Sequence, residues 1–595
     1  FAGPAVVGLG LCLGYPVWDR HLLSMGRYHR FTNLAKVLDQ VGWLDAMFRG
    51  TATLEAFKEL ELVYHGDGIG GFTAVLKDSP PFGLGEPVYT LSNSGKPDAS
   101  SDADMATQTL LAHLPMLFHP NPSEVMVLGL GSGITAGEVL HYPVGRLDIL
   151  EISPQVVEAS RFFLPWNNGV LSDPRTRLIV QDGRAHLQLT DRTYDVIISE
   201  PSNPWMAGLA TLFTREFFTL AMDRLREDGI FVQWLHTYSI DWPTFALVGR
   251  TFAEVFPNSA LVVTNPVSPS ADCLLVGFRG RDRFSLENAR RNVVFGRRSK
   301  NVDLVNPEVL TPLVLAEDLP RLFGAGPVNS DARPRLEFAA PRLLYTMDAE
   351  GSALAETVAK RAWLSPGLAQ RAKQVRTDID SQIDLAAYAF SLHWPFANMV
   401  DLSKATPAQR GRFATLAEAY AGNHIMDFSV LGDAELEHRC RLAQIRAIEA
   451  GIDSASDRAG AVLHVAGLYS DARMIPEAVA AYRSALQARP DSVEALRGLA
   501  WRLAVHTQAD FHDPNQAVAL AERAGSLAGG RPAVVMDTLA AAYAAAGQYD
   551  RAQAAARQAL ALFRESGRLD RAAQVESRLR LYAAGRPYSE PLPGP

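Results

Sequence analysis

The chain has 595 residues, of which 48% are hydrophobic and 21% are charged, with a net charge of −8 and a pI near 6.0. This length exceeds what one hydrophobic core organises, and it predicts roughly three or four folding units. The acidic balance excludes the basic footprint of a nucleic-acid-binding protein and favours a cationic or small-molecule substrate. Cys12, Cys273 and Cys440 are too widely scattered for a disulfide framework or a zinc site, so we expect no metal and a reducing compartment.

An apolar segment opens the chain. Residues 1–18 are almost wholly apolar, and charged residues follow from Asp19. Because the chain starts at Phe1 and not at Met, we expect a processed or truncated form with further residues upstream. One interpretation is the trailing end of a transmembrane helix, which would tether a cytoplasmic catalytic region to the inner membrane. A buried N-terminal strand or helix is the alternative, and both stay open.

Residues 19–115 are predicted to form a small β-rich domain. Short apolar runs over 60–64, 71–76 and 88–91 are bounded by turn sequences rich in Gly, Pro, Asn and Ser, a pattern typical of an antiparallel sheet.

Residues 116–345 alternate apolar runs with helical stretches, which predicts an α/β domain with a mostly parallel, doubly wound (Rossmann-type) sheet. Strands are expected near 125–130, 146–151, 176–180, 194–199 and 229–235, followed by a closing hairpin over 260–264 and 273–277.

The rest of the chain is predicted to be all-α. Residues 346–457 read as a helical linker region, and residues 458–590 as tetratricopeptide repeats. Small and large side chains follow the repeat order in three units that begin near Val462, Leu496 and Met536, the second with an insertion at 509–514. Such helix pairs bury together a face that one pair cannot bury alone. We therefore expect a surface for a protein partner, and a generic helical bundle is the alternative.

A glycine-rich loop follows the first strand of the α/β domain. Gly129, Gly131 and Gly133 would allow a sharp turn and a close approach of the backbone to a ligand. About twenty residues later, Glu151 ends the next apolar run, where it would accept hydrogen bonds from ribose hydroxyls. The spacing predicts a nucleotide site, and a tight strand-to-helix turn without a ligand is the alternative.

Two further acids follow strand-like runs at the same edge of the predicted sheet. Asp182, before Gly183, is placed to accept from an adenine amino group, although an Asp-Gly turn explains it equally well. Glu200 begins the sequence Glu200–Pro204, whose two prolines would hold Glu200 and Asn203 toward the ligand cleft. A carboxylate there can pair with a cation or take a proton from an attacking amine.

These motifs together resemble the spermidine synthase family, the polyamine aminopropyltransferases, and especially their membrane-linked bacterial relatives. The resemblance runs from about Trp18 to Tyr345 through Trp18–Arg20, Asp104–Gln108, His113–Pro115, His119–Pro122, the glycine loop, Leu150–Ile152, Asp173–Arg175, Gln181–Gly183, Tyr194–Asp195, Glu200–Pro204 and Val328–Pro334. It implies a β-rich N-terminal domain before a methyltransferase-like sheet. It also implies that the propylamine group of decarboxylated S-adenosylmethionine passes to putrescine.

The resemblance also implies roles for individual residues. Glu200 matches the catalytic acid, and Glu151 and Asp182 match the acids that bind ribose and adenine. The donor would lie on Gly129, Gly131, Ser132, Gly133 and Gly183, whereas Asp104, Gln108, Asn203 and Tyr238 would face the polyamine. A homodimer is among the expected assemblies.

Three positions depart from the family pattern. Ser132 and Asn203 stand where the family usually has aspartates, and Thr107 stands where a tyrosine is expected. The pocket would thus lack two negative charges, each worth about 1 to 4 kcal/mol to an ion pair at 4 Å, unless other acids compensate.

Two other functions stay open at this point. With Ser132 in place of an acid, ordinary S-adenosylmethionine would be accepted and a methyl group transferred. Alternatively, the nucleotide domain is vestigial and the repeats make the chain a scaffold. The presence of Glu151, Asp182 and Glu200 at three strand ends argues against the scaffold.

Overall fold

The computed structural model describes residues 19–26, 42, 43, 58, 60–68, 71–265, 272–280, 283–346, 352–392, 400–423, 433–529 and 532–590. The apolar segment 1–18, with its two interpretations, lies outside these residues. Among the helices of the described part, none combines the length and the apolar character needed to cross a membrane. Contacts divide the chain into two compact units, residues 1–79 with 87–413 and residues 80–86 with 414–595.

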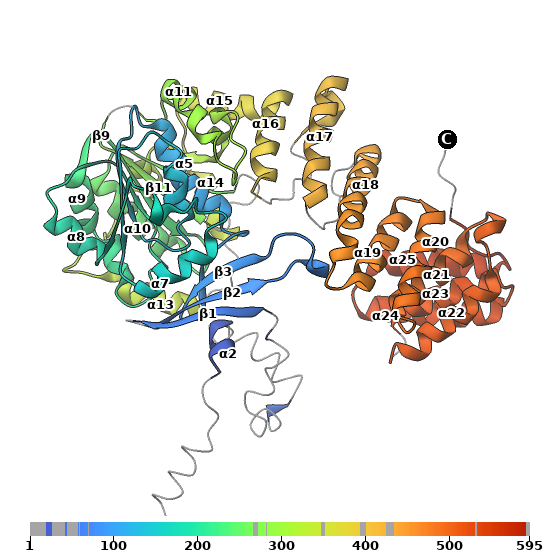
Figure 1. Ribbon diagram of the computed structural model, residues 1–595. Coiled ribbons are helices and arrows are strands. Elements are labelled where there is room, and N and C mark those ends of the chain that lie inside the picture. The colour runs from blue at the N-terminus through green and yellow to red at the C-terminus, as the bar shows by residue number, and fades with distance from the viewer. Residues whose placement is uncertain are drawn as a thin grey trace, which may run out of the picture. The chain divides into compact units, whose positions relative to one another are not determined.

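A four-stranded antiparallel sheet begins the first unit (Figure 1). Its strands in spatial order are β1 Glu61–Gly68, β2 Gly71–Asp78, β3 Val88–Asn93 and β4 Lys96–Ser100. The first three match the expected runs. The fourth was not expected, because its sequence has no large apolar side chain. A two-residue turn with positive φ at Ser94 and Gly95 sets β4 against β3, as in tight β-hairpins.

The central sheet has eight strands in the order β12-β10-β11-β9-β8-β5-β6-β7. The strands are β5 Glu124–Leu128, β6 Arg146–Glu151, β7 Thr176–Val180, β8 Tyr194–Ser199, β9 Leu225–His236, β10 Ser259–Val263, β11 Asp272–Phe278 and β12 Val314–Ala316. The strands from β5 to β9 are parallel, and β10, β11 and β12 pair antiparallel. The Rossmann-type sheet and its closing hairpin are therefore confirmed; only the short β12 was missed.

Helices cover both faces of the central sheet, as Figure 1 shows. Along β5, Val125 and Val127 belong to one core, whereas Met126 and Leu128 belong to the other. Burial of both faces explains why the parallel strands read as continuous apolar runs. The first unit as a whole contains the helices α2 Arg20–Ser24, α5 Met105–Phe118, α6 Ile134–Val139, α7 Pro154–Ala159, α8 Gly183–Leu189, α9 Arg215–Arg224, α10 Trp242–Val255, α11 Leu286–Gly296, α12 Leu319–Phe323, α13 Arg335–Thr346, α14 Ser352–Arg361, α15 Pro366–Thr377, α16 Ile379–Phe390 and the first part of α17 Pro407–Asn423.

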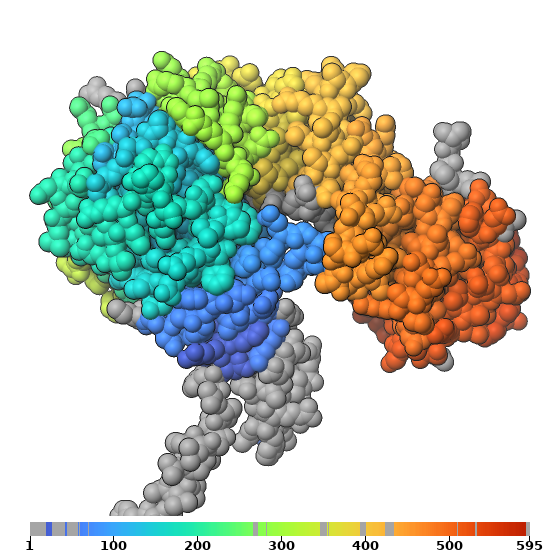
Figure 2. Space-filling view, in the orientation of Figure 1, coloured from blue at the N-terminus to red at the C-terminus, as the bar shows by residue number. Residues whose placement is uncertain are grey.

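The second unit is helical. Its helices are α18 Ala434–Gly451, α19 Arg458–Asp471, α20 Ile475–Ala488, α21 Val493–Val505, α22 Pro514–Leu527, α23 Ala533–Ala545, α24 Tyr549–Glu565 and α25 Leu569–Ala583. Sequential helices pack on one another through fully buried alanines such as Ala478, Ala500 and Ala521. Small side chains let the helices approach closely, and they form one continuous body in the space-filling view (Figure 2, orange to red). The tetratricopeptide interpretation stays a prediction.

Candidate active site

The glycine loop lies where β5 ends between β6 and β8, the position at which the strand order of the sheet reverses. Open α/β sheets bind ligands at such a point. Gly129 has φ +95°, and a Cβ there would lie 2.5 Å from the carbonyl oxygen of Glu200. Gly133, with φ +80°, is the N-cap of α6. The loop therefore needs glycine at Gly129 and Gly133 for its turn, and at Gly129 also because the backbone at the end of β8 passes close to it.

We expect Gly129→Ala to lower the affinity for an S-adenosyl ligand at least tenfold, because the methyl group must displace the Glu200 backbone. A matched control is Gly324→Ala, which has φ +64° but nothing within 4 Å of the added Cβ. This control carries only the conformational strain, of order 1–3 kcal/mol. Calorimetric titration and thermal unfolding of both variants separate strain from displacement. Equal ligand affinity in the two variants would contradict the steric argument.

Glu151 closes the loop from the side of β6. Its two carboxylate oxygens accept from the backbone N–H groups of Leu130, at 3.0 Å, and Ser153, at 2.8 Å. Burial raises the pKa of Glu151, and these backbone donors oppose the rise. The loop and the predicted ribose acid thus form one hydrogen-bonded element.

Asp182 lies at the end of the neighbouring strand β7. Its Oδ1 accepts from Ala185 N at 2.7 Å, so Asp182 is the N-cap of α8, whose first residue is Gly183. The side chain is exposed, and the Asp-Gly turn considered from sequence is present. Its adenine role stays a prediction.

A buried hydrogen-bond network joins the glycine loop to α5. The Ser132 hydroxyl donates to Gln108 Oε1, and Gln108 Nε2 donates to the carbonyl of Ser100 at 2.8 Å. Gln108 is 2% exposed and both ends of its amide are engaged. Ser132, which stands where the family usually has an acid, therefore holds the side chain of Gln108. The predicted contacts of both residues with ligands stay predictions.

Glu200 follows β8 and faces the start of α6. Thr135 Oγ1 donates to its Oε2 at 2.7 Å. Burial raises the pKa of Glu200 to about 8, and the charges of Asp104, Asp272 and Asp98 add to the rise, whereas the Thr135 hydrogen bond opposes it. Such a group is poised to hold or release a proton near neutral pH.

Asp272, at the start of β11, is an acid of this site that the sequence reasoning missed. Thr107 Oγ1 donates to its Oδ2 at 2.8 Å. Burial raises the pKa of Asp272 to about 6, aided by the charge of Asp104. An antiparallel strand begins at the edge where its parallel neighbours end, and Asp272 lies opposite His236 of β9. An acid just before the second apolar run of the closing hairpin was the available signal.

Asp98 and Lys96, on the unexpected strand β4, were missed as well. Lys96 Nζ lies 2.5 Å from Asp98 Oδ1, and the two side chains are 16% and 10% exposed. Ser202 also donates to Asp98 Oδ1 at 2.6 Å. Burial lowers the pKa of Lys96, but the negative charges around it, Asp98 and Asp104 among them, produce a net rise, so the ammonium stays charged. A strand outside the α/β domain therefore supplies charge beside Glu200.

Aromatic rings and unpaired polar atoms complete the site. Asn203 Nδ2 donates to the Tyr238 hydroxyl at 3.3 Å, while its Oδ1 is buried and has no partner among the described residues. Both ring nitrogens of His236 are likewise unpaired within the described part, and the ring packs edge-on against Trp205 at 4.5 Å. Lys96 lies 5.8 Å from the ring centre of Trp234. The site thus retains unused acceptors next to aromatic surface, which suits an ammonium.

Residues 104–278 match the family model for the spermine/spermidine synthase domain. The chain carries a spermine/spermidine synthase domain. This domain holds the glycine loop, Glu151, Asp182, Glu200 and Asp272, whereas Lys96 and Asp98 precede the matched residues. The resemblance to the spermidine synthase family is thereby confirmed over these residues, and the likeness to the membrane-linked relatives stays a prediction.

Individual relatives match the same region. A polyamine aminopropyltransferase of Bacillus subtilis (strain 168) is 34% identical over 184 residues, which are 30% of this chain and 66% of the relative. That of Thermotoga petrophila is 36% identical over 151 residues, 25% of this chain and 50% of the relative. A crystal structure of spermidine synthase from Thermotoga maritima is 27% identical, covering 37% of this chain and 74% of that chain with a TM-score of 0.32. The chain thus spans from half to just under two thirds of the length of these two curated relatives.

Within the described residues, no group of three or more His, Cys, Asp or Glu side chains has a geometry that could hold a metal ion.

Proposed function

We propose that the chain is an aminopropyltransferase that moves the propylamine group of decarboxylated S-adenosylmethionine to a polyamine such as putrescine. The observation that carries this proposal is a group of four acids that lie close together in one buried site, because the charges of Asp98, Asp104 and Asp272 all raise the pKa of Glu200. Asp272 adds an acid that can replace one of the two negative charges that Ser132 and Asn203 do not supply, whereas the charge of Asp98 is balanced by Lys96. Confining carboxylates is costly unless cations share the site.

The donor supplies an electrophilic carbon next to a sulfonium. On this chain, the glycine loop and Glu151 would hold its nucleoside, and Asp182 would contact the adenine. The acceptor ammonium would donate to Asn203 Oδ1, which is buried without a partner among the described residues. Glu200 would take the proton that the amine must lose. The new C–N bond forms as the C–S bond breaks, and methylthioadenosine leaves.

The same acids disfavour methyl transfer from ordinary S-adenosylmethionine. That donor carries a carboxylate where the decarboxylated donor has only a propylammonium. Like charges about 4 Å apart cost roughly 1 to 4 kcal/mol across the dielectrics of water and protein surface. Asp98 already compensates Lys96, the cation nearest these acids. The matched relatives are also aminopropyltransferases by name.

Product analysis tests the proposal. The purified chain should release methylthioadenosine from the decarboxylated donor plus putrescine, and no S-adenosylhomocysteine from the ordinary donor. Release of S-adenosylhomocysteine together with a methylated amine would replace the proposal with methyl transfer. If neither product forms and calorimetry detects no nucleoside binding, the scaffold interpretation is the one that remains.

The pKa of Glu200 predicts the pH dependence of the reaction. Because the pKa of Glu200 is about 8, its carboxyl is mostly protonated in the free site below about pH 8 and cannot accept a proton. We expect kcat/KM to rise about tenfold per pH unit up to about pH 8 and then to level off. Free amine acceptors have a pKa near 10, so the part of the pH–rate profile that reports their deprotonation lies at higher pH than the part that reports Glu200. Initial rates between pH 6 and 9 check this, and a flat profile below pH 8 would contradict it.

A further inference from the structure

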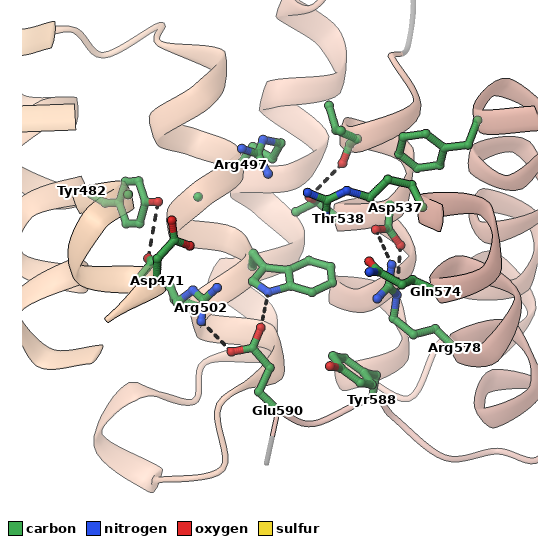
Figure 3. Close-up of a pocket in the computed structure, with 17 residues that line it drawn as sticks. Asp471, Tyr482, Arg497, Arg502, Asp537, Thr538, Gln574, Arg578, Tyr588 and Glu590 are labelled. Carbon is green, nitrogen blue, oxygen red and sulfur yellow. Dashed lines mark hydrogen bonds and ion pairs between the residues drawn. The ribbon is translucent and has the colours of Figure 1, made fainter. Parts of the chain in front are cut away.

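The C-terminal helices enclose a cavity of about 660 Å³ that the proposed reaction does not use. Residues of α19, α21, α23 and α25 line most of it, α20 and α24 contribute one residue each, and Tyr588 and Glu590 of the segment 586–590, which follows α25, complete the lining (Figure 3). We call residues 586–590 the tail segment. The tail segment thus lies along this groove and forms part of its wall.

The carboxylate of Glu590 in the tail segment accepts hydrogen bonds from two side chains of α21. Trp501 Nε1 donates to its Oε1 at 2.8 Å, and Arg502 donates to its Oε2 at 2.6 Å. The backbone N–H of Glu590 also donates to the carbonyl of Val505 at 3.1 Å. Figure 3 shows the Glu590 carboxylate pointing toward Arg502. An indole N–H and a guanidinium meeting at one point form a receptor for a carboxylate.

Tyr588 occupies a second position two residues earlier. The Arg578 guanidinium lies 5.4 Å from the centre of its ring and 5.3 Å from that of Trp501. Arg578 is itself fixed by Asp537, whose two carboxylate oxygens accept from it at 2.7 and 3.2 Å. The groove thus has a preorganised cationic surface for an aromatic ring beside its carboxylate position.

Without the tail segment, the lining of the groove has more basic than acidic side chains. Four arginines line it, at 497, 502, 571 and 578, against the two aspartates 471 and 537. Burial raises the pKa of Asp537, and the charges of Arg578, Arg571 and Arg497 oppose that rise. Glu590 is the one acidic residue that the tail segment brings to this lining.

We propose that the groove docks an extended peptide segment of a partner protein that carries an aromatic residue two positions before a carboxylate, and that the tail segment occupies the groove until such a partner displaces it. The tail segment defines the occupant, because its ring, its carboxylate and the backbone N–H of Glu590 each meet a matching group. The proposal is independent of the reaction assigned to the synthase domain.

Displacement can be measured with a fluorescent, capped peptide that copies residues 584–590. The receptor is the full chain carrying Tyr588→Ala and Glu590→Gln, which frees the groove; the wild-type chain keeps its tail segment bound. We expect the freed chain to bind the peptide at least tenfold more tightly than the wild type. A peptide with Gln in place of its Glu should bind at least tenfold more weakly, and Arg502→Gln in the freed chain should abolish that difference.

Circular dichroism first establishes that each variant retains its helices. Equal binding of the Glu and Gln peptides, or no binding by a folded freed chain, would overturn the proposal. Dimers in light scattering that disappear with Glu590→Gln would overturn it differently, because the occupant would then be a second copy of this chain.

Discussion

Replacing Glu200 with Gln is expected to lower kcat about 10²- to 10⁴-fold, the usual range for loss of a general base. Gln keeps the shape of the side chain and can still be hydrogen-bonded by Thr135, but it cannot take the amine proton. Affinity for the donor should change by less than about threefold, because the nucleoside is assigned to the glycine loop and Glu151. Single-turnover rates and calorimetric titration of the donor measure the two effects separately.

Thr135→Val is the matched control for this substitution. It removes the hydroxyl that donates to Glu200 at 2.7 Å but leaves the carboxyl in place, so we expect a loss of kcat of about tenfold or less. An unchanged kcat in Glu200→Gln would remove Glu200 from the proton transfer. Equal losses in both variants would indicate that the site needs the hydrogen bond and not the base.

Glu200→Gln should also stabilise the fold at alkaline pH. In the unfolded chain the Glu200 carboxyl ionises near its ordinary pKa of 4.5, whereas in the folded chain it holds its proton up to about pH 8. Stability is therefore lost as pH rises between these values, with a total loss of about 5 kcal/mol above pH 8. Gln avoids this loss. Urea midpoints should nearly coincide at pH 4.5 and favour the variant at pH 9.

Replacing Asp98 with Asn is expected to cost about 3–5 kcal/mol of folding free energy, the usual effect of removing one partner of a buried ion pair. It leaves the Lys96 ammonium, 2.5 Å from Asp98 in the native chain, without its main counter-charge. The site also gains a net positive charge, so the KM for the amine acceptor should rise at least tenfold. Urea unfolding and acceptor titrations measure the two quantities.

The double variant Lys96→Met with Asp98→Asn tests whether charge is the cause. Removing both partners of a buried pair is often close to neutral, so most of the lost stability should return. If the double variant is no more stable than Asp98→Asn alone, the hydrogen bonds that Ser202 and Asn93 donate to Asp98 account for the loss.

Much of the fold could be predicted because the central strands are buried on both faces. Apolar runs such as 194–199 leave little ambiguity, and the glycine loop and Glu200 follow directly from their ends. Strand β4 could not be predicted in this way. Its sequence lacks an apolar pattern, and a tight turn together with pairing to β3 creates it.

The sequence by itself determined the Rossmann-type sheet, the family, and the positions of Gly129, Glu151 and Glu200, because these depend on local periodicity and on residues at strand ends. Only the tertiary structure decided which other charges share the site. Lys96 and Asp98 come from a separate sheet, and Asp272 is about seventy residues beyond Glu200 in the chain. Electrostatic interaction depends on distance in space and on burial, and neither can be read from sequence separation. The contact of Glu590 with Arg502, which lies 88 residues earlier, could not be predicted from the sequence for the same reason.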